Sequence, residues 1–222
     1  MTALSTIQPI TLREQIVEKI RMAIIEGELE PGDHIVETDL TEQLGVSRTP
    51  VREALILLES QGLVKFLPNR GCFVRAFDQR DVEEIFSMRT TLEDFAAELI
   101  LERMTEVDFA HLSGLIDEQT QLIEKKQLKI ARRVDMSFHQ YLVEKSQHEI
   151  LIKSWTQIVA QIVALLNARA AGLPEFDEWD AIRDHQEIVA AYRSGELTQV
   201  HRVNQEINGR VAERCMIAIN SR

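Results

Sequence analysis

The sequence has 222 residues, of which 45% are hydrophobic and 27% are charged, and its formal net charge is −11 at pH 7. This length suits one large domain or two small ones, and no apolar run approaches the roughly 18 to 20 residues that a membrane-spanning helix needs. Composition and charge therefore argue against a membrane protein, and against a protein that coats nucleic acid nonspecifically through lysine and arginine.

The first third of the chain predicts three helices and a β-hairpin. Apolar residues recur at helical spacing from Leu12 to Ala23, and Gly27 ends that pattern. Gly45 can supply the left-handed turn after a second helix, and Ser47 is a suitable N-cap for a third. The expected helices span residues 12–26, 37–44 and 48–61, and the expected strands span residues 63–66 and 72–75, around a turn at 68–71.

From Asp78 onward the pattern is helical almost throughout. Six helices are expected, near residues 79–103, 106–125, 127–146, 148–171, 179–193 and 196–219. We therefore predict a mostly α protein with two domains. A winged helix-turn-helix, made of three helices plus a β-hairpin, spans residues 1–77, and an all-α bundle of about six helices spans residues 78–222.

The second helix of the predicted helix-turn-helix begins with side chains that suit DNA. Arg48, Thr49 and Arg52 lie in its first turns, the end that enters the major groove in such proteins. Arginine can make two parallel hydrogen bonds to guanine, and a hydroxyl such as that of Thr49 can anchor phosphate. Ser47 at the cap belongs to the same candidate set. Arg70, at the tip of the hairpin, can reach the minor groove or its backbone.

Local charge agrees with this interpretation. Between Ser47 and Arg75 the chain carries five basic side chains and two acidic ones, a net charge of +3. One basic patch on an acidic body repels DNA from every other face of the protein. The alternative is that these arginines are solvated, or that they pair with Glu53 and Glu59 in a purely structural role.

Three ionisable side chains in the second domain are expected to point inward. Asp135 and His139 are four residues apart, so they share one face of a helix, and that face also carries Phe138. His185 likewise lies among apolar residues of its helix. Burying such groups unpaired is expensive, so they must satisfy one another, bind a metal or line a polar cavity. The residues alone leave open a hydrogen-bonded core cluster and a divalent metal site with imidazole and carboxylate ligands.

One block of sequence resembles a known family. The stretch LGVSRTPVREAL at Leu44–Leu55, with EGELEPGDHI before it and PNRGCFV after it, is similar to the DNA-binding domain of the GntR family. The helices that follow resemble the FCD effector domain of its FadR-type subgroup. This resemblance implies a homodimer that binds a short inverted repeat in double-stranded operator DNA, with Arg48 and Arg52 reading bases. Thr38 departs from the pattern, because some relatives carry a further DNA-contacting arginine there.

The resemblance also implies a metal and an effector. Asp135, His139 and His185 match three metal-ligand positions of the FCD domain, in which the metal helps to hold a carboxylate effector. The fourth ligand is usually histidine, and its place falls here on Ile207, which cannot coordinate a metal. Water or Asn204 would then complete the coordination of a zinc- or nickel-class ion.

Arg89 completes the set of candidate effector residues. It flanks an apolar stripe that is expected to include Met88 and Phe95, and the family often uses an arginine there to clamp an effector carboxylate. The alternative is a snorkelling side chain paired with Glu93 one turn on. The remaining histidines are not expected to take part in the site: His34, His111, His148 and His201.

Together these features predict a ligand-responsive transcriptional repressor. Its ligand is expected to be a small organic acid, bound by Arg89, Asp135, His139 and His185. We expect it in the cytoplasm and off the membrane, because the N-terminus lacks the basic start and apolar block of a secretory signal. A metalloenzyme with two histidines and a carboxylate is one alternative, but no nucleophile–base pair or HExxH-like motif accompanies them, so no enzyme is expected. A DNA-binding regulator controlled by a partner protein is the other.

Overall fold

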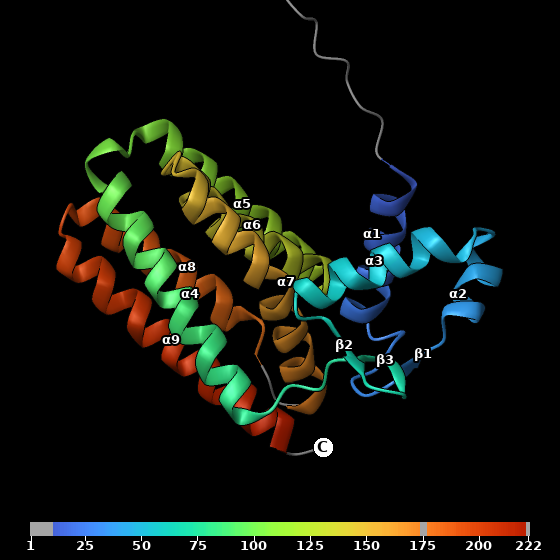
Figure 1. Ribbon diagram of the computed structural model, residues 1–222. Helices are drawn as coiled ribbons and strands as arrows, with labels where there is room; N and C mark the ends of the chain where they lie inside the picture. The colour runs from blue at the N-terminus through green and yellow to red at the C-terminus, as the bar shows by residue number, and fades with distance from the viewer. Residues whose placement is uncertain (1–10, 174–176, 221–222) are drawn as a thin grey trace, which may run out of the picture. The chain divides into compact units, whose positions relative to one another are not determined.

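The computed structural model describes residues 11–173 and 177–220, and the chain divides into two compact units, Met1–Ala76 and Phe77–Arg222 (Figure 1). Each unit buries its own set of apolar side chains. Within the described residues, strands occur in the N-terminal unit alone and the C-terminal unit is helical. The predicted fold class, a winged helix-turn-helix followed by a helical bundle, is confirmed.

The N-terminal unit is built on a pair of packed helices. Its elements are α1 (Leu12–Ile25), β1 (His34–Ile35), α2 (Glu37–Leu44), α3 (Arg48–Ser60), β2 (Val64–Leu67) and β3 (Gly71–Val74). Helix α1 begins with a capping box in which the side chains of Thr11 and Glu14 accept each other's backbone N–H groups. It packs against α3, whose Val51, Leu55 and Leu58 have no exposed surface. Helix α2 and strand β2 contact the same α3.

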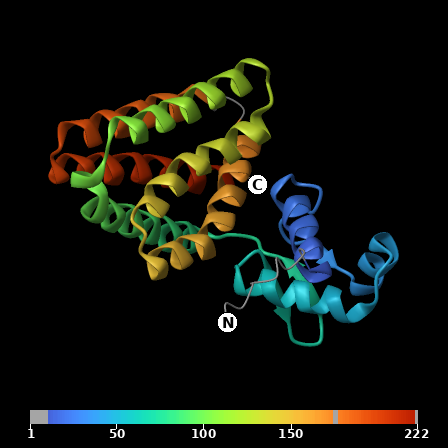
Figure 2. The ribbon, with the colours of Figure 1, turned by 90° about the horizontal axis from the view of Figure 1, so that it is seen from above.

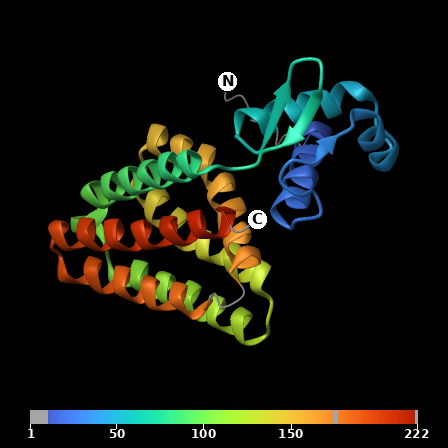
Figure 3. The same cartoon turned by 90° about the horizontal axis from the view of Figure 1, so that it is seen from below.

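The sheet has one strand more than the predicted hairpin. Its order is β1–β3–β2 and both pairings are antiparallel (Figure 3). Phe66 lies opposite Cys72 in the hairpin, while His34 of β1 lies opposite Phe73. Strand β1 has two residues, which is too short for the alternation by which a strand is recognised in a sequence. Its position is therefore decided by pairing with β3 and not by its own pattern.

A left-handed glycine makes the tight turn between α2 and α3. Gly45 has φ 66° and ψ 34°, and its N–H donates to the carbonyl of Thr41 at the end of α2. Ser47 occupies the N-cap position of α3 as predicted, but its side chain makes no capping hydrogen bond. The hydroxyl lies on an exposed residue and is available to another partner.

The C-terminal unit is a bundle of long helices (Figure 2). They are α4 (Gln79–Ile100), α5 (Glu106–Glu124), α6 (Leu128–Lys145), α7 (Glu149–Gly172), α8 (Trp179–Ser194) and α9 (Leu197–Asn220). Helix α4 packs along α9 and also contacts α6 and α7, whereas α5 packs on α6 and α8. The sequence predicts α4 to continue to residue 103, but Leu101–Arg103 is a 3₁₀ turn. Helix α4 thus contacts three other helices of the bundle, α6, α7 and α9.

The buried face of α4 differs in part from the predicted stripe. Met88 and Phe95 are exposed by 48% and 37%, so assigning them to the apolar stripe is wrong. The buried face instead carries Ile85, Leu92 and, between them, the charged pair Arg89 and Glu93. Ionic side chains that bond each other can occupy positions which hydrophobic periodicity assigns to aliphatic residues. The face that α4 turns to the core is therefore partly ionic.

Helix α7 is the one described helix that is long and apolar enough to cross a membrane by length and composition. No uninterrupted apolar run in the sequence predicts a membrane-spanning helix there. In the bundle, α7 buries Leu151, Trp155 and Ile162 and packs against α4, α6 and α9. Apolar residues of α7 therefore form part of the core of the helical unit.

We expect Gly45→Ala to destabilise the N-terminal unit by about 1–2 kcal/mol, because an L side chain in the left-handed region places its Cβ against the following carbonyl. Urea unfolding followed by circular dichroism measures the change. The control is Glu42→Ala on the exposed side of α2, which should alter stability by less than about 0.5 kcal/mol. Equal effects of the two substitutions would show that the turn does not require the glycine.

Candidate functional site

The N-terminal end of α3 presents a polar, basic surface. Ser47, Arg48, Thr49 and Arg52 are all exposed, whereas Val51 and its apolar neighbours face α1. Within residues 11–173 and 177–220, no ion pair involves Arg48 or Arg52. The Glu59 carboxylate accepts the backbone N–H of Phe66 at 2.8 Å. Burial of one helix face thus leaves two guanidinium groups directed to solvent.

The tip of the hairpin is held by ring stacking. The Arg70 guanidinium carbon lies 5.6 Å from the centre of the Phe73 ring, and His34 stacks on the same ring at 4.7 Å. Gly71, with φ 96°, brings the backbone close enough that an added Cβ would lie 2.7 Å from His34 Nε2. Cation–π contact restricts the guanidinium of Arg70 while leaving its N–H groups exposed.

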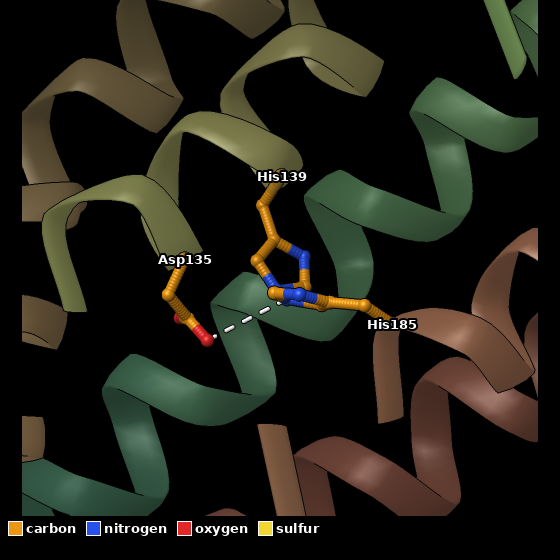
Figure 4. Close-up of side chains that lie close together, drawn as sticks. All are labelled: Asp135, His139 and His185. Atoms are coloured by element: carbon orange, nitrogen blue, oxygen red, sulfur yellow. Dashed lines mark hydrogen bonds and ion pairs between the residues drawn. The ribbon is translucent and has the colours of Figure 1, made fainter. Parts of the chain in front are cut away.

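A second constellation lies inside the helical unit. Asp135 and His139 project from α6 and His185 projects from α8 toward them (Figure 4). All three are buried, and one ligand atom from each lies within 4.8 Å of the others. His185 Nε2 is 3.5 Å from Asp135 Oδ1 and 3.3 Å from His139 Nε2. The inward orientation that helical spacing predicts is therefore present, and the donor atoms converge.

The neighbours of His139 determine which of its nitrogens carries the proton. The Glu93 carboxylate, which can only accept, lies 2.9 Å from His139 Nδ1. The Arg89 guanidinium, which can only donate, places Nη2 at 2.7 Å from His139 Nε2. Both contacts are satisfied by a neutral ring with its proton on Nδ1 and a lone pair on Nε2. Arg89 Nε also donates to Glu93 at 3.0 Å, which closes the chain of contacts.

Burial and charge together set the ionisation of the cluster. Burial lowers the pKa of His185 to about 3, so this imidazole is neutral at physiological pH. For Glu93, burial alone would raise the pKa, but Arg89, His139 and the amide of Asn208 hold it well below its usual range. Burial alone would also raise the pKa of Asp135, but nearby positive charge lowers it, and the groups that remain charged beside neutral imidazoles are the guanidiniums of Arg89 and Arg169. The cluster thus offers two imidazoles and an ionised carboxylate.

A small cavity of about 30 Å³ adjoins these side chains. Its charged lining includes Arg89, Arg169, Arg214, Asp180 and Asp184, besides the three clustered residues. Its apolar lining comes from Leu166, Ala181, Ile188, Ile207 and Val211. This volume holds about two waters or one ion.

The donor set fits a divalent metal with three protein ligands. Neutral imidazole nitrogens and a carboxylate are ligands that zinc and nickel accept, and Glu93 on His139 Nδ1 supplies the outer hydrogen bond usual for a metal-binding histidine. Ile207 lines the cavity, as its predicted place at the fourth-ligand position requires. Asn204, which the sequence offers beside water for that position, is not among the lining residues of the cavity, and its amide nitrogen donates to Asp94 Oδ1 at 2.9 Å.

Several members of the cluster are not predicted from the sequence. Glu93 is expected only as the partner of a snorkelling Arg89, yet Arg89 and Glu93 are 2% and 6% exposed, so snorkelling is wrong. Asn208, which donates to Glu93 at 2.7 Å, interrupts the apolar stripe of α9. Arg169 is buried in the lining of the cavity. Charged or amide residues within otherwise apolar helix faces are the sequence signal for all three.

The other histidines lie away from the cluster. His148 caps α7 by accepting the N–H of Leu151 at 3.2 Å, and the ring of His111 packs at a tilt against that of Tyr141. His201 lies 3.9 Å from Glu98. With His34 on the Phe73 ring, each of them has a contact of its own outside the site.

Two family models match the chain. The model of the bacterial regulatory proteins of the gntR family matches residues 12–74, and the FCD domain model matches residues 84–208. The first covers the helix-turn-helix and hairpin, and the second covers the helices that carry the buried cluster.

Individual relatives agree with these models. The uncharacterised HTH-type transcriptional regulator YdhC of Bacillus subtilis is 33% identical over 139 residues, which are 62% of this chain and 62% of that protein. The gluconate operon transcriptional repressor of Bacillus licheniformis is 25% identical over 88% of this chain and 83% of its own length. The solved structure of E. coli McbR/YncC superposes with a TM-score of 0.75 at 27% identity, covering 91% of this chain and 95% of that one.

The depressed pKa of His185 predicts how stability depends on pH. The unfolded chain protonates this imidazole near pH 6.5, whereas the folded protein does not do so until about pH 3. Because the unfolded state binds the extra proton between these values, the free energy of unfolding falls as pH falls. From pH 7 to pH 5 we expect His185 to contribute a loss of up to about 2 kcal/mol.

Urea unfolding at the two pH values measures this loss. His185→Gln should show a smaller pH dependence than the wild type, and His111→Gln, at an exposed position, should keep the wild-type dependence. An unchanged pH dependence in His185→Gln would contradict the assignment of a neutral buried imidazole.

Proposed function

Because the chain belongs to the GntR family and carries the FCD domain of its FadR-type subgroup, it is a DNA-binding transcriptional regulator, and we propose that it is a homodimeric repressor of an inverted-repeat operator. Its relatives are regulators and not enzymes. A repressor role is supported by the name of the gluconate operon relative. A repressor of chromosomal operators would act in the bacterial cytoplasm.

We propose that α3 reads bases and that the hairpin contacts the adjacent minor groove. The observation that supports this role is the exposed row of Arg48, Thr49 and Arg52 on a helix whose opposite face is buried. Arg48 and Arg52 would bond guanine edges, while Thr49 and Ser47 would bond phosphate. Arg70, restrained by Phe73, would enter the minor groove.

We further propose that the helical unit responds to a small organic acid. Arg89, Asp135, His139 and His185 would form the binding site, with a zinc- or nickel-class ion held by the last three. When bound, such an ion offers open coordination positions to carboxylate oxygens. Arg89 would orient the acid through its guanidinium, because a planar donor pair matches a carboxylate.

Chain connectivity suggests how the response reaches DNA. Strand β3 ends at Val74 and α4 begins at Gln79, so few residues separate the hairpin from the helix that carries Arg89 and Glu93. The cavity of about 30 Å³ has room for an ion, and we expect an acid that binds beside the ion to shift the helices that line it. A shift of α4 would alter the spacing of the two recognition helices in the dimer.

We expect Arg52→Ala to weaken operator binding by about 1–3 kcal/mol and to relax base preference at one position. Fluorescence anisotropy with operator and scrambled duplexes at one salt concentration measures both effects. Arg80→Ala, which removes the same charge from an exposed position on α4, is the control and should bind as the wild type does. Equal losses on operator and scrambled DNA would assign Arg52 to the phosphate backbone.

A bound effector should change operator affinity by about 5- to 150-fold, the range of a coupling free energy of about 1–3 kcal/mol. Operator binding measured across a panel of small carboxylates, with zinc present, tests this expectation. Asp135→Asn should lose the response but keep the operator affinity of the free protein. If every acid that binds the protein leaves operator affinity unchanged, the regulatory role of the cavity is refuted.

A further inference from the structure

Arg89 occupies the position at which a metal would approach His139. Its Nε donates to Glu93 Oε1 at 3.0 Å, and its Nη2 reaches His139 Nε2 at 2.7 Å. The same Nε2 lies 3.3 Å from His185 Nε2, on the side of the ring where the candidate ligands converge. One atom therefore belongs both to the ion-pair network and to the candidate metal site.

These two uses of His139 Nε2 exclude each other. The proton on Nδ1 is fixed by Glu93 at 2.9 Å, so Nε2 has a single lone pair in the plane of the ring. That lone pair can accept from the guanidinium or bind a cation, but it cannot do both. A guanidinium and a divalent cation at one nitrogen would also repel each other. Arg89 Nη2 must therefore leave before His139 can coordinate.

The displaced guanidinium then needs a new acceptor. Its Nε can remain on Glu93, but of the other carboxylates that line the cavity Asp135 would hold the cation, and Asp180 and Asp184 already pair with arginines. Asp184 accepts from Arg210 at 2.5 Å, and Asp180 is bonded by Arg214. A buried donor without a partner is costly, so displacement by a cation alone is opposed. A small carboxylate entering the cavity would supply the missing acceptor.

We propose that Arg89 is an internal, displaceable cation at the candidate metal site, so that a divalent metal and a small organic acid bind there cooperatively. The metal releases Arg89 from His139, and the acid stabilises the released guanidinium. Each ligand thereby raises the affinity of the other. This inference rests on the proposed effector function, because it concerns the same cavity.

Lysine at position 89 separates the two contacts of the arginine. A lysine ammonium reaches about as far as the Nε and Cζ of arginine, so Arg89→Lys can keep the charge and the pairing with Glu93. It loses the second donor that extends to His139 Nε2. Arg214→Lys makes the same substitution elsewhere in the lining of the cavity, where the arginine pairs with Asp180. It is the matched control, and both variants preserve net charge.

The experiment measures Co²⁺ binding to the full-length wild type and both variants, by calorimetry and by the visible absorption of the bound ion. Each titration is made in sodium chloride and in sodium acetate at equal ionic strength. We expect acetate to tighten Co²⁺ binding to the wild type and to Arg214→Lys by at least about 5-fold. Arg89→Lys should bind Co²⁺ about 10-fold more tightly than the wild type in chloride, with an acetate effect below about 2-fold.

Three results would overturn the inference. The first is an Arg89→Lys affinity in chloride equal to that of the wild type, and the second is a full acetate effect that persists in this variant. The third is absence of Co²⁺ binding in all three proteins. Operator binding is measured in parallel without metal or acid, so failure of the cavity inference is distinguished from failure of the DNA-binding proposal.

Discussion

A buried ion pair organises the helical unit. Removing a charged group from water costs several kcal/mol even after the protein relaxes, so each polar atom of Arg89 and Glu93 must find a partner inside. Glu93 meets this demand by accepting from Arg89, His139 and Asn208. These residues come from α4, α6 and α9, so satisfying one carboxylate ties three helices together. The packing of these three helices and the ionisation of the Glu93 carboxylate therefore depend on the same hydrogen bonds.

The same network prepares the candidate binding site. A carboxylate on Nδ1 of His139 fixes the tautomer whose Nε2 is directed at Asp135 and His185. Burial keeps His185 neutral, which is the form of imidazole that can coordinate. Interactions that hold the helices together thus also set the chemistry of the cavity. A ligand that rearranges one of these contacts also changes the contacts of α4 within the helical unit.

In the N-terminal unit, one face of helix α3 packs in the core and the opposite face carries exposed basic side chains. Helix α3 buries Val51, Leu55 and Leu58 against α1 and leaves Arg48 and Arg52 exposed on its other side. Because the chain as a whole carries a net charge of −11, such a local basic surface is a marked exception. Charge concentrated on one element favours a defined orientation of a polyanion over general adhesion. The small sheet adds Arg70, restrained by an aromatic ring.

The sequence by itself determined the fold class, the helix-turn-helix with its left-handed Gly45, and the inward face shared by Asp135, His139 and His185. Each follows from local rules, because helical periodicity and glycine conformations depend on residues close in the chain. Tertiary structure alone decided that β1 pairs with β3, that Met88 and Phe95 remain exposed, and that Asn208 rather than Asn204 serves the cluster. It also placed the Arg89 guanidinium on His139. These outcomes depend on which helices meet and on which buried charge finds a partner across 50 or more residues of sequence, and no local pattern contains that information.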